Sequence, residues 1–366
     1  MPRSPAAWII TTARNRAIDR LRSERSRSAS EIARLRTLEE TAIDHPLDEH
    51  DLPIPDERLG LIFACCHPAL ALDAQVPLTL RLVAGLSVPE VARALLLPPA
   101  TVAQRLVRAK RKIRDAAIPI AEPPAGQLPD RIGAVLTVLY LVYTEGYAAT
   151  AGDGLRRDDV AEEAIRLATV LHGLMPDEAE PTALLALMTL HHARRAARTG
   201  PDGALVLLPD QDRSLWDGTA IARGVALVER ALRMRRPPGR YALEATIAVL
   251  HAEAPTAGGT DWPQVLAVYD ALRLTAPSPV VELNRAVALA EVEGPESALV
   301  VVEEIGVRGD LARYAPLHAV RADLLRRLGR AEEAAGAYAA AAALDDNPAE
   351  RAFLAARAQT GASGST

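Results

Sequence analysis

A polar and strongly basic stretch between residues 101 and 112 carries side chains that can bind DNA. A threonine and a glutamine near its start, with an arginine just behind, can hydrogen-bond base edges in a major groove, and the later cations suit phosphates. The side chains concerned are Thr101, Gln104, Arg105, Arg108, Lys110, Arg111 and Lys112. A helix whose charges only face solvent is the alternative. Six cations between residues 105 and 114, without an acid among them, favour a DNA interface.

A helix-turn-helix is the element that would position these side chains. Ser87, with Glu90 three residues later, forms the capping-box pattern that begins a first helix. Ala92 is the small residue needed where the two helices cross, and Pro99 suits the first position of the second helix. Leu96 stands in the turn where glycine is commoner, so we expect an altered turn geometry.

The second helix should separate its apolar from its polar residues. The apolar residues recur at helical spacing and must face the core; they are Val102, Leu106, Ala109 and Ile113. The other face then presents the polar and basic residues, as contacts to bases and phosphates require.

The opening of the chain is a second candidate for nucleic-acid binding. Between residues 3 and 36 there are nine arginines and three acids, a local charge of +6. Apolar residues from Trp8 to Leu21 form one helical face, and the rest carries the candidate DNA-binding residues Arg14, Asn15, Arg16, Arg20 and Arg22. Such a helix can equally face solvent or an acidic partner. Its position ahead of a helix-turn-helix favours DNA.

Cys65, Cys66 and His67 could in principle bind zinc or supply a nucleophilic thiol. They lack the spaced fourth ligand of a structural zinc site. Their apolar neighbours, Phe63 and Leu70, instead indicate small buried side chains at the end of a helix.

Three other groups fit structural roles better than ligand sites. We interpret His191 and His192 as a surface and core pair on a helix, and the acids between 210 and 216 as caps for a helix beginning near Ser214. The tyrosines at 140, 143 and 147 fit packing, with a ligand groove as the less favoured alternative. The sequence has no glycine-rich phosphate loop and no nucleophile elbow. We therefore expect no enzyme, no catalytic residue, no metal and no cofactor.

The composition predicts an all-α protein. Hydrophobic residues make up 49% of the 366 residues and aromatic residues only 3%, which favours helix packing over sheets. The net charge of -5 does not exclude a DNA partner, because the cations are concentrated locally. Neighbouring cysteines imply no disulfide framework, and no stretch approaches 18 consecutive apolar residues. We expect a cytoplasmic protein with no membrane contact.

Changes in composition divide the chain into five parts. They are a basic helical region at 1–37, an acidic linker with prolines at 38–55, a helix-turn-helix domain of three to four helices at 56–117, a proline-rich joint at 118–130 and a larger C-terminal helical domain at 131–360. Apolar runs in the last part predict helices at 131–149, 158–175, 178–197, 214–235, 239–254, 262–275, 278–292, 295–305, 313–328, 331–343 and 348–358. The run from Leu324 to Pro348 matches the tetratricopeptide pattern, so we expect helical hairpins.

Two segments together resemble one family of bacterial proteins. Ala7 to Arg22 and Leu80 to Arg114 resemble conserved regions 2 and 4 of extracytoplasmic-function sigma factors, which belong to the sigma-70 family. The runs at 63–70, 208–216 and 276–286 resemble the subgroup with a C-terminal, tetratricopeptide-like extension. The resemblance covers nearly the whole chain, and the pair of segments is far more specific than either alone.

The resemblance implies a role in transcription initiation. It implies RNA polymerase core and promoter DNA as partners, minus-35 recognition by the second helix of the helix-turn-helix, and partial minus-10 recognition by the basic opening helix. It also implies that the C-terminal domain contacts the sigma regions and regulates them. Residues 1–37 match only the later part of region 2, so we expect its first half to be missing. A tetratricopeptide-like scaffold or DNA-binding regulator that does not recruit core polymerase is the alternative.

Overall fold

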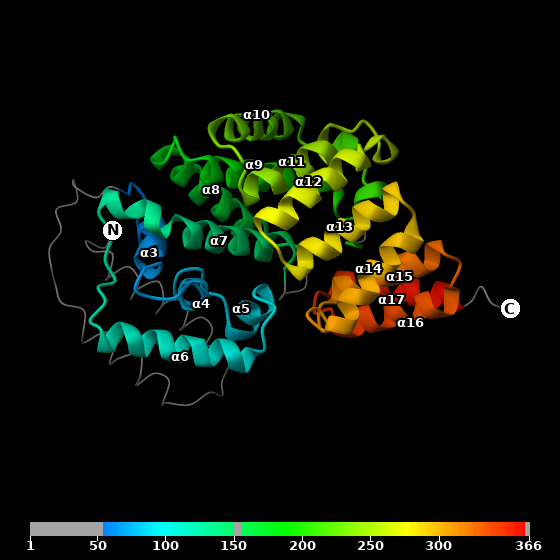
Figure 1. Cartoon of the computed structure of the whole chain (residues 1–366), viewed down its shortest axis with the longest axis horizontal. Coiled ribbons are helices and arrows are strands. Elements are labelled where there is room, and N and C mark those ends of the chain that lie inside the picture. The colour runs from blue at the N-terminus through cyan, green and yellow to red at the C-terminus, as the bar shows by residue number, and fades with distance from the viewer. Residues whose placement is uncertain (1–53, 150–154, 202, 363–366) are drawn as a thin grey trace.

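The computed structural model describes residues 54–149, 155–201 and 203–362. Within these ranges every regular element is a helix, and the one β-type contact is an isolated bridge between Thr199 and Leu205. The predicted all-α fold is therefore confirmed (Figure 1). The basic opening segment, with the candidate residues from Arg14 to Arg22, lies outside the described residues.

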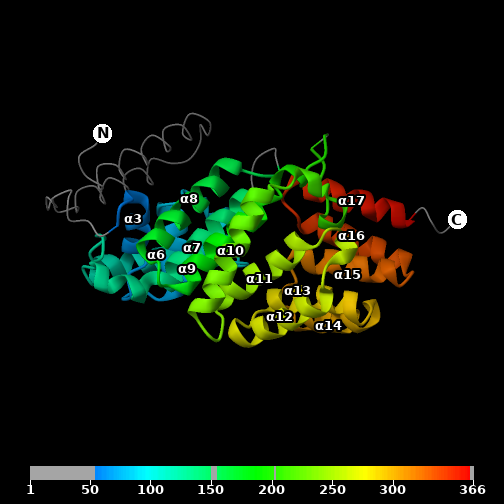
Figure 2. The same ribbon diagram turned by 90° about the horizontal axis from the view of Figure 1, so that it is seen from above.

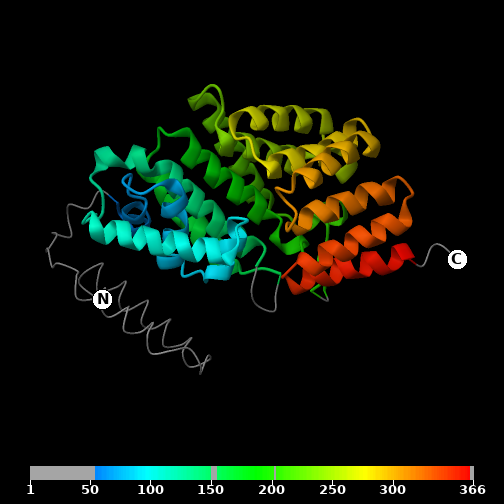
Figure 3. The ribbon, with the colours of Figure 1, turned by 60° about the horizontal axis from the view of Figure 1, so that its bottom comes forward.

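Four helices form the first part of the fold. They are α3 (Glu57–Cys65), α4 (Leu72–Leu82), α5 (Val88–Ala94) and α6 (Pro99–Asp115). The longest of them, α6, packs on α4 and α5 through one face. Figure 3 shows α6 running along the outside of this group, where no other described helix covers its outer face.

The long helix α7 (Leu128–Tyr147) joins this group to the rest of the molecule. A short 3-10 turn, η1 (Ala125–Gln127), precedes it. On one side α7 contacts α3, α4 and α5, and on the other it contacts α8 (Asp158–Leu174) and α9 (Ala179–Ala193). The helices α10 (Gly218–Met234) and α11 (Arg240–Glu253) pack on α9. Buried side chains from Ile54 in front of α3 to Ala248 in α11 form a single hydrophobic cluster.

The remaining helices follow one another as neighbours. They are α12 (Trp262–Thr275), α13 (Pro279–Val292), α14 (Pro295–Arg308), α15 (Ala315–Arg327), α16 (Ala331–Leu344) and α17 (Pro348–Ala362). Each packs chiefly on the helix before and after it, and a second hydrophobic cluster runs from Leu283 to Leu354. Seen from above, these helices occupy the end of the molecule opposite α3 and α6 (Figure 2).

The eleven helices predicted beyond residue 130 are all present. Three differ by four residues at one end: the helix predicted at 178–197 ends at Ala193 and is followed by the turn η2 (Arg195–Ala197), the helix predicted at 214–235 begins at Gly218, and the helix predicted at 348–358 ends at Ala362. The second difference arises because Asp217, not Ser214, caps α10, by accepting a hydrogen bond from the Ala220 N–H.

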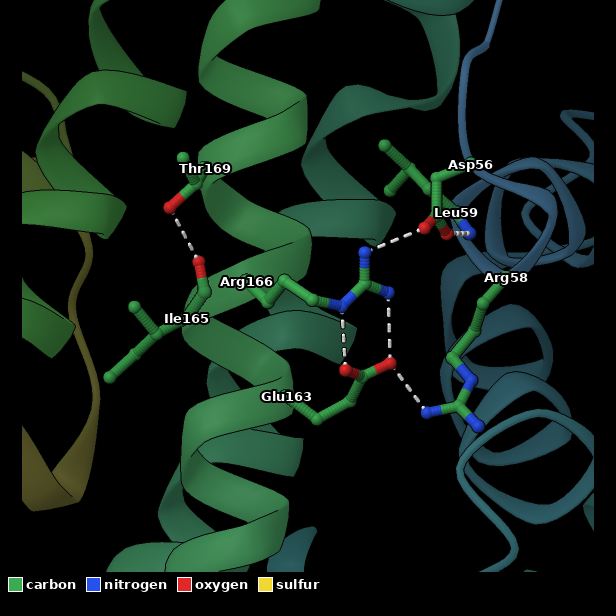
Figure 4. Close-up of polar contacts among 7 residues, drawn as sticks. All are labelled: Asp56, Arg58, Leu59, Glu163, Ile165, Arg166 and Thr169. Carbon is green, nitrogen blue, oxygen red and sulfur yellow. Dashed lines mark hydrogen bonds and ion pairs between the residues drawn. The ribbon is translucent and has the colours of Figure 1, made fainter.

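Charged side chains join α3 to α8 at the surface (Figure 4). Arg166 of α8 donates to Asp56 at 2.7 Å and to Glu163 at 2.7 Å, while Arg58 of α3 donates to the same Glu163 at 2.6 Å. Burial alone would raise the pKa of Asp56, but the hydrogen bonds from Arg166 and from the Leu59 N–H lower it below its ordinary value. These contacts are partly exposed, so they orient the two helices more than they stabilise them.

Candidate nucleic-acid interface

The first helix of the helix-turn-helix begins as the sequence predicts. The Ser87 N–H donates to the Glu90 carboxylate at 2.5 Å, and the Glu90 N–H donates to the Ser87 hydroxyl at 3.4 Å. This reciprocal capping box satisfies two backbone donors at the start of α5. Ala92, the predicted crossing residue, is fully buried.

The turn after α5 has an ordinary geometry, and not the altered geometry expected from the sequence. Leu96 has a φ of +53°, the left-handed conformation that a glycine would adopt there. The Leu97 N–H donates to the Ala92 carbonyl at 2.8 Å and the Leu96 N–H donates to the Arg93 carbonyl at 2.9 Å. These two bonds are those of a Schellman motif, so the helix ends in the ordinary way despite the bulky residue. The expectation was wrong because the hydrogen bonds outweigh the steric strain.

The core-facing side of the second helix is confirmed. Val102, Leu106 and Ala109 are buried against α4 and α5, and Ile113 is half-buried. Pro99 occupies the start of α6, where no intrahelical donor is lost. A buried face of four apolar residues fixes which residues α6 turns outward.

The predicted DNA-binding residues of α6 lie in two groups. The side chains that face solvent are Gln104, Arg108, Lys110, Arg111 and Lys112. Thr101 and Arg105 are half-buried at the border next to α4. There Arg105 lies 3.7 Å from the Asp73 carboxylate and 3.5 Å from the Asp73 carbonyl oxygen. Arg105 therefore contacts α4. It would reach a base only by giving up its partly exposed ion pair with Asp73.

Val107 is a surface residue that the sequence pattern did not single out. It is 66% exposed in the middle of the basic face, between Gln104 and Arg111. An exposed apolar side chain in a major-groove helix can contact a thymine methyl group. Helical spacing places Val107 opposite the buried face of α6 that contains Val102. This spacing is the sequence signal that could have identified Val107 as a surface residue.

The electrostatic character of this face is strongly positive. Over its length of 17 residues, or about 25 Å, α6 has one acid, Asp115 in its last position. Asp115 lies 3.5 Å from Arg114, at the C-terminal end of α6. Except for Arg105, the cations before Arg114 therefore face solvent, as phosphate contacts require.

The cysteine pair is buried, as the structural interpretation predicts. Cys65 ends α3 and Cys66 follows it, and burial raises the pKa of each thiol to about 12. Thiols with so high a pKa stay protonated and are poor nucleophiles or metal ligands. Among the described residues no three histidine, cysteine or carboxylate side chains are grouped to hold a metal ion.

The acids between 210 and 216 also take the predicted capping role in part. Asp212 accepts a hydrogen bond from the Ser214 N–H at 2.9 Å, in the short turn η4 (Arg213–Leu215). Asp210 is exposed at the end of the turn η3 (Leu208–Asp210).

None of the helices in the described part of the chain combines the length and the apolar character that crossing a membrane requires.

Comparison with known proteins identifies two segments. Residues 61–113, which include α4, α5 and most of α6, match the family model for sigma-70, region 4. Residues 131–232 match a family of unknown function, DUF6596. An uncharacterized protein of Rhizobium meliloti (strain 1021), R00370, is 43% identical over 354 residues, which are 96% of this chain and 83% of that protein. No solved structure matches the chain.

Proposed function

The chain belongs to one family with its Rhizobium meliloti relative and contains a segment similar to sigma-70 region 4, and from this premise we propose that it is an extracytoplasmic-function sigma factor of the sigma-70 family. In this role it directs RNA polymerase core to promoters that carry a specific minus-35 element. The observation that carries the proposal is the exposed, acid-poor face of α6 within a capped helix-turn-helix.

The proposed mechanism is recognition without catalysis. The second helix, α6, enters the major groove with its N-terminal half, where Thr101 and Gln104 read base edges and Arg105 joins them after exchanging its contact with Asp73 for a base. Arg111 and Lys112, nearer the C-terminal end, bind phosphates and fix the register. The chemistry of RNA synthesis belongs to the polymerase, so this chain needs no active site of its own.

The basic opening helix supplies the second promoter contact in this proposal. Residues 14–22 belong to the segment from Ala7 to Arg22 that resembles region 2, and they bind near the minus-10 element when α6 occupies the minus-35 element. Their arginines neutralise phosphates there. These residues are outside the described structure, so the sequence alone supports this part.

The C-terminal helices are proposed to be a tetratricopeptide-like regulatory extension. Two observations support this role. Leu325, Ala334 and Tyr338 are buried, and Gly329 has a φ of +75°, as the predicted repeat pattern requires. The extension also contacts the DNA-binding part directly, since Arg93 of α5 forms an ion pair with Asp346 in the loop before α17. A covalently attached domain in contact with region 4 can control its access to DNA.

Selection of bound duplexes from a random library tests the DNA-reading role. We expect Gln104→Ala to relax base preference at one position, with a loss of about 1–3 kcal/mol on the preferred sequence. Arg111→Ala should weaken binding to all sequences and lower the slope of log affinity against log salt by about 1. Arg223→Ala, an exposed arginine on α10, is the matched control and should change neither quantity.

Capture of a purified bacterial core RNA polymerase separates the two functional candidates. A sigma factor binds core polymerase without DNA and supports transcription from the selected sequence. Binding of the selected DNA with no capture of polymerase would refute the sigma-factor proposal and favour a DNA-binding regulator. Deleting the part of the extension that follows residue 256 then tests its regulatory role. Unchanged transcription would exclude a regulatory role for this part.

A further inference from the structure

Three arginines from separate elements meet where α7, α9 and α11 end. Arg194 caps the end of α9, Arg198 follows the turn η2, and Arg213 begins the turn η4. We call this group the arginine cluster. Arg194 is close enough to lower the pKa of both Arg198 and Arg213, after the larger effect of burial.

Tyr147 at the end of α7 holds two members of the cluster. Arg194 donates from Nη2 to the Tyr147 hydroxyl at 2.8 Å and lies 3.1 Å from Nδ1 of His191. The guanidinium of Arg198 lies 3.4 Å above the centre of the Tyr147 ring and donates to the Tyr147 carbonyl oxygen. Both arginines are therefore held in fixed positions by neutral groups.

Arg213 is fixed in the same way from the other side. It donates to the carbonyl oxygens of His251 at 2.9 Å and Ala254 at 2.8 Å, at the C-terminal end of α11. Its guanidinium lies 4.3 Å above the ring of Trp216. Carbonyls at a helix end and an aromatic face stabilise a cation but do not neutralise it.

The arginine cluster has no counter-charge bonded to it among the described residues. Most arginines of the chain that the structure describes make ion pairs with carboxylates, but none of these three does. Arg198 is only 5% exposed. Burying an unpaired cation costs several kcal/mol, so buried charges are normally paired or bind a ligand.

Neighbouring groups add hydrogen-bond donors but little charge. The hydroxyl of Tyr143, a residue 2% exposed, and the indole N–H of Trp216, a residue 8% exposed, have no hydrogen-bond partner. Burial lowers the pKa of His191 to about 3 and that of His251 to about 4, so both are neutral at pH 7. Glu350 of α17 lies near Arg198, and because burial raises its pKa to about 7 it supplies only about half a negative charge at pH 7. The surroundings therefore offer an excess of donors and positive charge.

We propose that the arginine cluster is a binding site for the phosphate group of a small phosphorylated metabolite. A phosphate has several oxygens to accept bonds from three guanidinium groups, and its charge supplies the missing partner for them. Arg194 and Arg213 are half-buried, so an ion can reach them from solvent. The site lies in the C-terminal extension, apart from α6, and goes beyond DNA recognition.

Calorimetric titration of the full-length protein with inorganic phosphate, at constant ionic strength and without DNA, tests the site. We expect binding in the unaltered protein and an affinity about tenfold weaker in Arg194→Gln and in Arg213→Gln, because each loses one charge-assisted contact. Tyr143→Phe removes only an unpartnered hydroxyl, so it should fold normally and weaken binding severalfold. Circular dichroism confirms that each variant keeps its helices.

Two further variants assign the binding to this site. Arg223→Gln on the exposed side of α10 is the control and should bind phosphate as the unaltered protein does. The double variant Arg108→Gln, Arg111→Gln removes the competing basic face of α6, and loss of the measured binding in it would place the phosphate on that face and overturn the proposal. The absence of phosphate binding, or unchanged affinity in both cluster variants and in Tyr143→Phe, would also overturn it. None of these results depends on whether the chain recruits polymerase.

Discussion

Leu96 and Ala117 are strained residues at equivalent places, each just after a helix of the helix-turn-helix. Their φ angles are +53° and +47°, in the region that disfavours residues with a Cβ. Ala117 also begins a Schellman motif, in which the Ile118 N–H donates to the Ile113 carbonyl at 2.9 Å. The backbone hydrogen bonds and the buried Ile118 side chain hold the conformation against a cost of about 1–2 kcal/mol per residue.

Replacing Leu96 by glycine should stabilise the protein. Glycine adopts positive φ without strain, and we expect this gain to exceed the loss of burial at Leu96, which is 45% exposed. We expect the free energy of unfolding in urea to rise by about 1 kcal/mol. Ala94→Gly, two residues earlier inside α5, is the control and should lower it by about 1 kcal/mol. A loss of stability in Leu96→Gly would show that the turn is not strained.

Glu350 should make stability fall as the pH rises. Burial and the nearby Asp345 carboxyl raise its pKa from 4.5 to about 7, while Arg198 opposes this increase. Between about pH 4.5 and pH 7 the folded protein therefore keeps a proton that the unfolded chain has lost, and the penalty is complete above pH 7.

Glu350→Gln removes this penalty. We expect the variant to be more stable than the unaltered protein by about 2 kcal/mol at pH 8 and equally stable at pH 4. Thermal unfolding at a series of pH values measures the difference. A stability difference that does not change with pH would rule out a raised pKa for this group.

Individual residues were predicted well where the signal was local. The capping box and the buried positions of α6 depend on neighbours a few residues away, and both are present. The cap predicted near Ser214 was only partly right, because Asp212 caps the turn η4 while Asp217 caps α10. The partner of Arg105 could not be predicted, because Asp73 is 32 residues away in sequence. The arginine cluster was missed for the same reason, since its members come from three separate elements.

At the scale of whole helices, α7 and α8 approach each other closely at Gly146. A Cβ atom on Gly146 would lie 2.4 Å from the backbone nitrogen of Ala161, a distance that real contacts do not show. Gly146 is therefore needed for the two helices to pack. Periodicity predicted both helices to within three residues at each end but contains no information about how closely they approach.

Gly146→Ala should be destabilising despite the better helix propensity of alanine. Backbone atoms cannot move aside as a flexible side chain can, so we expect a loss of about 2–3 kcal/mol in the free energy of unfolding. Gly133→Ala on the same helix is the matched control. Nothing lies within 4 Å of its added methyl group, and propensity should raise stability by up to about 1 kcal/mol. Equal effects of the two substitutions would argue against a close crossing of α7 and α8.

Across the whole molecule, the hydrophobic core does not stop at the end of the helix-turn-helix. Buried residues of α3 and α4 belong to one cluster with those of α7, α8 and α9. Arg131 at the start of α7 donates to the Phe63 carbonyl of α3 at 2.9 Å. Composition predicted separate parts at 56–117 and 131–360, because the prolines between them resemble a linker. Which apolar faces pack together is a long-range property that composition does not contain.

Truncation should therefore have different effects at two places. A chain ending at residue 130 exposes the surfaces of α3 and α4 that pack on α7, so we expect it to bind a hydrophobic dye and to unfold without a sharp transition. A chain ending at residue 256 keeps the whole first cluster and should unfold cooperatively. Differential scanning calorimetry compares them, and a sharp transition in the shorter chain would show that the helix-turn-helix folds alone.

The shared core makes the proposed DNA recognition depend on synthesis of the chain as far as α11. On the ribosome, α6 leaves the exit tunnel well before the last residues of its supporting cluster, near Ala248, have been made. A nascent chain therefore carries the reading helix without the scaffold that holds it in place. We therefore expect a nonsense codon or a protease cut between α8 and α11 to abolish the proposed promoter contact without altering a single residue of α6.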